Sequence, residues 1–86
     1  MINIFQNIIE KYVNDLTTKD LESFAKSKDL KYTNDELLIV YQFIKYNYKE
    51  LLKQNIKVFE LIKEKVNPIL YKQLINLYIE YKQKYL

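Results

Sequence analysis

The sequence predicts an all-α fold, a single compact bundle of four to five helices with short connections and no β-sheet. Apolar residues recur at helical spacing along most of the 86 residues. Segments typical of helix N-termini separate these apolar runs. No alternating run is bounded by the turn residues of a β-hairpin. Because the chain also lacks a linker or a low-complexity segment, we expect residues 1–86 to form one domain.

The first two helices are predicted near residues 2–14 and 18–28. One apolar stripe marks the first helix, made of Ile4, Phe5, Ile8, Ile9, Tyr12, Val13 and Leu16. The second begins at Thr17, a good N-cap residue, with Asp20 at the third helical position. A carboxylate at that position can accept a hydrogen bond from the cap residue's own amide, which completes a capping box.

The third helix is predicted near residues 34–46, and its apolar positions cover almost every side. Thr33 and Glu36 repeat the capping-box pattern at its start. Its main stripe is Leu37, Val40, Tyr41, Ile44 and Tyr48, and the apolar residues off that stripe are Leu38, Ile39 and Phe43. A helix that is apolar nearly all round is usually central, so we expect this one to occupy the middle of the bundle.

The boundary after this helix is open between two interpretations. Asn47, with Glu50 three residues later, resembles another cap, which favours a break at Asn47 and a fourth helix near residues 48–65. The apolar spacing instead continues through Asn47 and would suit one long helix to about residue 54. We favour the break. Because the chain has no glycine, Asn14, Asn47 and Asn55 are the expected left-handed residues at helix ends.

The last helix is predicted over residues 68–85. Asn67 is the expected cap, and Pro68 stands at the first helical position, which proline favours. The face directed toward the core is predicted to hold Leu70, Leu74, Leu77, Tyr78, Tyr81 and Tyr85.

Residue types that most enzymes need are missing from this chain. It has no His and no Cys, which removes the usual general base near neutral pH and the common ligands of zinc. It has no Gly, which excludes glycine-rich phosphate loops. We therefore expect a protein that is not an enzyme and binds no metal or cofactor. No apolar run is long enough to span a bilayer, and we expect a cytoplasmic protein.

Several apolar residues of the last helix lie off its main face. If this helix packs on one side only, these residues stay exposed and favour contact with another protein or with a second copy as a homodimer. The candidate partner-binding residues are Ile69, Ile75, Ile79, Tyr85 and Leu86. Binding of another protein is the leading functional hypothesis.

The alternative is a nucleic-acid-binding module that uses the basic half of the chain. Residues 1–44 carry five lysines and seven acids, and residues 45–86 carry nine lysines and four acids. A basic region of this kind attracts phosphates. The candidate phosphate contacts are Lys49, Lys53, Lys57, Lys72, Lys82 and Lys84.

Four segments of the chain match a known pattern: "IFQNII", "LTTKDLESFAK", "FIKYN" and "VNPILYKQLINLY". The matching positions are Gln6–Ile8, Thr17–Leu21, Ala25, Phe43–Tyr48, Pro68 and Leu77–Tyr78. In these features the whole chain resembles the YqfT-like family, small proteins of unknown function from Bacillus-type bacteria. The chain departs at Tyr46, where the family has Gly. The resemblance implies a cytoplasmic helical protein and no particular activity. Residues 16–44 also resemble two-helix nucleic-acid modules of the SAP kind, but lack their Gly and Arg.

Overall fold

The computed structural model describes the backbone of residues 4–85 and the side chains of residues 8–84. These residues form four α-helices and one 3₁₀ helix, without a strand, so the all-α prediction is confirmed. The elements are α1 (Ile4–Asp15), α2 (Thr18–Ser27), α3 (Asn34–Leu52), η1 (Ile56–Leu61) and α4 (Pro68–Tyr85).

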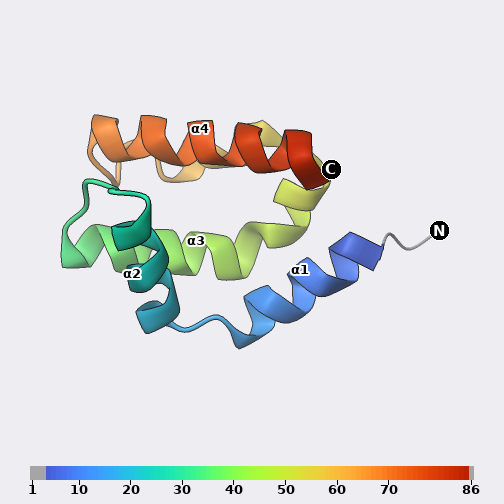
Figure 1. Ribbon diagram of the computed structural model, residues 1–86. Helices are drawn as coiled ribbons and strands as arrows, with labels where there is room; N and C mark the ends of the chain where they lie inside the picture. The colour runs from blue at the N-terminus through green and yellow to red at the C-terminus, as the bar shows by residue number, and fades with distance from the viewer. Residues whose placement is uncertain (1–3, 86) are drawn as a thin grey trace.

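The helix α3 is the centre of the arrangement, as its apolar surface predicts. It contacts α1, α2 and η1, and α4 runs beside it in the same direction (Figure 1). The segment from residue 53 to residue 67 makes this parallel packing feasible, because it carries the chain back from the end of α3 to its beginning. In the view of Figure 1, α1 is drawn below the C-terminal half of α3 and α4 above it.

Three predicted helix starts are confirmed by side-chain hydrogen bonds. The hydroxyl of Thr17 accepts from the amide of Asp20 at 3.1 Å, and the Asp20 carboxylate accepts from the amide of Thr17 at 3.2 Å. Thr33 and Glu36 make the same reciprocal pair, at 3.2 and 2.9 Å. Asn67 caps α4 through its side-chain oxygen, which accepts from the amide of Leu70 at 2.8 Å. Each cap satisfies a backbone donor that the helix leaves free.

The predicted break at Asn47 is wrong, because α3 continues through this residue to Leu52. The Asn47 side chain donates from Nδ2 to the carbonyl of Phe43, one turn back, at 3.0 Å. It therefore bonds within the helix and does not cap a new one. The preceding residue, Tyr46, is 84% exposed and supplies no apolar contact that would hold a helix start. The continuous apolar spacing decides the outcome here.

The predicted helix over residues 48–65 is also wrong. Its first residues belong to α3, and the chain then turns at residues 53–55 into the short η1. Gln54 makes the turn with a φ of 63°, while the amides of Gln54 and Asn55 donate to the carbonyls of Leu51 and Glu50, both at 3.0 Å. This is a Schellman motif, which ends a helix by placing one residue in the left-handed conformation.

The helix α2 ends in the same way at Asp29, whose φ is 54°. The amide of Leu30 donates to the carbonyl of Ala25 at 3.0 Å, and the amide of Asp29 to that of Lys26 at 3.2 Å. Within residues 4–85, Asp29 and Gln54 are the non-glycine residues with positive φ. The expected left-handed residues Asn14, Asn47 and Asn55 do not adopt this conformation.

The core consists of two neighbouring clusters of buried side chains. The first cluster contains Leu21, Val40, Val66 and Leu70, and the second contains Phe43, Val58, Phe59 and Ile62. The Phe59 ring lies 5.1 Å from that of Phe43 and 5.4 Å from that of Tyr78, centroid to centroid. The short η1 thus supplies an aromatic side chain that joins α3 to α4.

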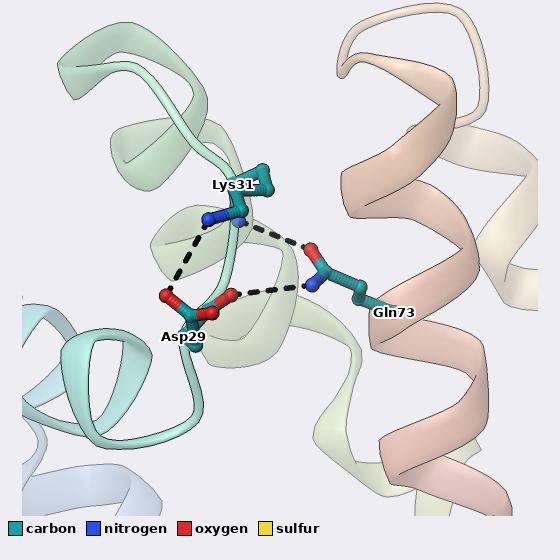
Figure 2. Close-up of polar contacts among 3 residues, drawn as sticks. All are labelled: Asp29, Lys31 and Gln73. Carbon is teal, nitrogen blue, oxygen red and sulfur yellow. Dashed lines mark hydrogen bonds and ion pairs between the residues drawn. The ribbon is translucent and has the colours of Figure 1, made fainter.

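Gln73 of α4 fastens the loop between α2 and α3 (Figure 2). Its Oε1 accepts from the amide of Lys31 at 3.0 Å, and its Nε2 donates to the carbonyl of Asp29 at 3.3 Å. The ammonium of Lys31 also lies 3.4 Å from the carboxylate of Asp29. One amide side chain therefore satisfies two backbone groups on either side of Leu30, which turns toward the first core cluster.

Candidate functional site, an apolar groove

A large apolar groove opens where the four α-helices approach one another. Its volume is about 570 Å³, within the range of small-molecule and peptide sites. Its lining comes from every α-helix: Ile9, Tyr12, Val13, Leu16, Leu21, Phe24, Ile44, Tyr48, Leu51, Leu52, Tyr78, Tyr81 and Lys82. Lys82 is the one charged residue in this set.

The wall formed by α1 is held in place by polar side chains of α3. The Tyr41 hydroxyl donates to the carbonyl of Leu16 at 3.0 Å, and the Lys45 ammonium donates to the carbonyl of Asn14 at 2.9 Å. Both acceptors lie at the C-terminal end of α1, where carbonyls lack helical partners. About one helical turn further along α3, the Tyr48 hydroxyl donates to the Glu10 carboxylate at 3.1 Å.

These three contacts attach α1 along a single side. Burial, together with the hydrogen bond to Glu10, raises the pKa of Tyr48, so this hydroxyl keeps its proton and its role as a donor at neutral pH. The groove then forms on the side of α1 that faces α2 and α4.

The opposite wall is aromatic. The rings of Phe24 and Tyr81 lie 6.4 Å apart and join α2 to α4. The Tyr78 hydroxyl donates to the carbonyl of Leu51, so its polar atom is satisfied and its ring is left for apolar contact. Burial raises the pKa of Tyr78. Tyr and Phe walls of this kind are common in protein interfaces.

A smaller cavity of about 190 Å³ lies deeper in the bundle. It shares several walls with the groove, namely Leu21, Phe24, Ile44, Leu51, Tyr78 and Tyr81. Its lining also includes Val40 and Leu70 of the first core cluster and Phe43 and Phe59 of the second, so this cavity reaches into both clusters.

Two exposed apolar side chains of α1 form a ridge at the edge of the groove. Ile8 is 59% exposed and Tyr12 is 61% exposed, one helical turn apart. Only Val13 and Leu16, among the stripe residues whose side chains are described, are buried. The sequence predicted this stripe, and within residues 8–16 only part of it is buried. Many apolar residues in so short a helix indicate more apolar area than one neighbouring helix can cover. This was the signal available in the sequence.

The residues predicted to bind a partner occupy other positions. Ile69 and Ile79 are exposed, at 62% and 39%, and neither lines the groove. Ile75 is half-buried and packs against the second core cluster. The side chain of Tyr85 and the whole of Leu86 lie outside the described residues. The structure thus leaves Ile69 and Ile79 as separate exposed positions of α4.

Four of the six lysines predicted to bind phosphates lie at the ends of α3 and α4, and Lys57 and Lys72 lie apart from them. Lys49 and Lys53 lie at the end of α3, and Lys82 and Lys84 at the end of α4, close to one another because the two helices are parallel. Lys72 lies ten residues before Lys82, about 15 Å away along the helix. Lys57, in η1, is exposed. The cations at the two helix ends complement the negative ends of both helix dipoles.

Within the described residues, no three Asp or Glu side chains gather closely enough to hold a metal ion. None of the helices in residues 4–85 is both long and apolar enough to cross a membrane. No family model, curated protein or solved structure matches the chain.

Proposed function

We propose that this chain is a small protein-interaction module that binds an apolar helical surface of a partner in the groove between α1 and α4. The observation that carries the proposal is the groove itself, a recess of about 570 Å³ in which Lys82 is the one charged residue among the described lining residues. A recess lined by aliphatic side chains and aromatic rings suits the apolar side chains of a partner better than it suits water. The family resemblance adds no competing activity, and we propose membership of the YqfT-like family alongside it.

The form of the groove favours a helix as the bound element. Its walls are helices, and its lining is made of aliphatic side chains and aromatic rings whose hydroxyls already have partners at Tyr48 and Tyr78. A helix that presents apolar residues at positions i, i+3, i+4 and i+7 fills such a groove with side chains and satisfies its own backbone. An extended peptide would bring unpaired backbone groups into an apolar recess, which is costly.

The test is a selection of helical peptides from a displayed library against the folded chain. The variant Leu52→Glu places a charge on the groove wall, and Leu38→Glu is the matched control, because Leu38 is 48% exposed and lies outside the groove. We expect selected peptides to bind the wild type and the control and to lose affinity at least about tenfold for Leu52→Glu. Peptides that bind all three equally would contradict the proposal.

A second candidate function, nucleic-acid binding, has one specific observation in its favour. Tyr46 is 84% exposed, and Lys49 and Lys53 follow it on the same side of α3. An exposed ring flanked by cations can stack on a base and neutralise phosphates. Fluorescence anisotropy of labelled single-stranded DNA, duplex DNA and RNA over a salt series tests this. A logarithm of the binding constant that falls linearly with the logarithm of the salt concentration, together with loss of binding in Tyr46→Ala, would favour nucleic-acid binding.

A further inference from the structure

We infer that the occupant of the groove is α1 of a second copy of this chain, so that the protein forms a symmetric dimer in which each copy inserts the ridge of Ile8 and Tyr12 into the groove of the other. This inference rests on the proposed function and names the partner. It assigns to one chain both halves of a single interface.

The first argument is that the two surfaces are complementary and adjacent. The ridge is apolar and convex, with two exposed side chains one helical turn apart, and the groove beside it is apolar and concave. A twofold axis brings the ridge of each copy to the groove of the other and covers both at once. Tyr12 belongs to both surfaces, since it is exposed on the ridge and also lines the groove. The axis therefore passes close to the two Tyr12 rings.

The second argument is charge. Lys82 lines the groove and is half-buried, and within residues 4–85 no carboxylate pairs with its ammonium. The helix α1 carries Glu10, Lys11 and Asp15, a net negative charge, and has no basic residue in its last turn. Asp15 is exposed, and none of the ion pairs within residues 8–84 includes it. A second copy brings Asp15 to the Lys82 ammonium, so that the two opposite charges pair across the interface.

Cysteine cross-linking tests the arrangement without ambiguity, because the chain has no native cysteine. Under mild oxidation at low protein concentration, Tyr12→Cys should form a covalent dimer rapidly, since the twofold axis brings the two positions together. The control Tyr46→Cys is at least as accessible, at 84% exposed, and should cross-link at least about tenfold more slowly. Equal rates for the two variants would overturn the inference.

Sedimentation equilibrium provides the second measurement. We expect a wild-type dimer whose dissociation constant rises at least about tenfold in Ile8→Glu and is unchanged in Leu38→Glu, with circular dichroism confirming that both variants fold. Lys82→Gln should weaken the dimer and reduce its salt dependence. A wild type that stays monomeric overturns the inference, as does a dimer indifferent to Ile8→Glu. A monomer that still binds the selected helical peptides leaves the proposed function standing, whereas a monomer that binds none contradicts both.

Discussion

The carboxylate of Glu36 binds Asn67 across the starts of two parallel helices. Nδ2 of Asn67 donates to both carboxylate oxygens of Glu36, at 3.1 and 3.2 Å, and the backbone amide of Asn67 donates to the same group. Glu36 also completes the capping box of α3 with Thr33. One side chain therefore caps its own helix and fixes the beginning of α4 beside it, which keeps α3 and α4 parallel and so sets the far wall of the groove.

The first prediction concerns the pH dependence of stability. Burial acts to raise the pKa of Glu36, but the hydrogen bonds from Thr33 and Asn67 outweigh it, and the pKa lies below its ordinary value of 4.5. A carboxyl whose pKa is lower in the folded state stabilises the fold above its unfolded pKa. That contribution is lost as the pH falls through the folded pKa.

We therefore expect Glu36→Gln to be less stable than the wild type at pH 7, by about 1–2 kcal/mol, and to approach it in acid. Urea unfolding between neutral pH and about pH 2 measures the difference. Asp35→Asn is the control, because Asp35 is exposed in the same turn. Two stability curves that stay parallel down to the lowest pH would contradict the role of Glu36.

The second prediction separates a true cap from an apparent one. Thr33→Ala removes a side chain that caps α3 and should cost about 1 kcal/mol of unfolding free energy. Asn47→Ala removes only a bond to a carbonyl that the helix already uses, and alanine is the better helix former. We expect Asn47→Ala to be neutral or stabilising by up to about 0.5 kcal/mol. If Asn47→Ala lost as much unfolding free energy as Thr33→Ala, the result would contradict this prediction and favour a helix start at Asn47.

The third prediction follows from the left-handed residue at the end of α3. Gln54 holds a φ of 63°, a conformation that costs a side-chain-bearing residue roughly 1 kcal/mol and costs glycine almost nothing. Gln54→Gly should therefore raise the unfolding free energy by about 0.5–1 kcal/mol. The same substitution at Gln42, an exposed position inside α3, should lower it by about 1 kcal/mol. Thermal unfolding of both variants measures the contrast, and a change of the same sign in each would contradict it.

The fourth prediction concerns the two hydrogen bonds from Gln73 to the loop between α2 and α3. Gln73→Ala removes both backbone hydrogen bonds at Lys31 and Asp29 and should cost about 1–2 kcal/mol. Hydrogen exchange gives a local measurement, since the amide of Lys31 should exchange faster in this variant. Gln83→Ala, at an exposed position of α4, should leave that amide unchanged. An unchanged Lys31 exchange rate in Gln73→Ala would show that the loop is held by other contacts.

Local signals predicted the parts of this fold that depend on local bonds. Thr17, Thr33 and Asn67 form their hydrogen bonds within one turn, so their spacing was sufficient to place three helix starts. Asn47 has the same local pattern but lies within an apolar run that packs continuously against neighbouring helices. Sequence spacing could not decide between a helix start at Asn47 and a continuous helix, because the packing of Phe43 and Leu51 against η1 and α4 is a tertiary effect.

The groove could not be predicted for a related reason. The apolar stripe of α1 was visible in the sequence, but its division into buried Val13, wall residue Ile9 and exposed Ile8 depends on how Tyr41, Lys45 and Tyr48 attach α1 to α3. Those three contacts join residues that are 25 to 38 positions apart. The left-handed turn at Gln54 was likewise hidden, because asparagine is the residue type expected there.

The measurement that tests the central claim most directly is an isotope-filtered NOE experiment on an equimolar mixture of ¹³C-labelled and unlabelled chains at millimolar concentration. Only contacts between copies give signals in this experiment. The account predicts cross-peaks from the methyl groups of Ile8 in one copy to those of Leu52 and the ring of Tyr81 in the other, since Ile8 does not line the groove of its own chain. A spectrum without these cross-peaks, from a sample that relaxes as a monomer, would contradict it.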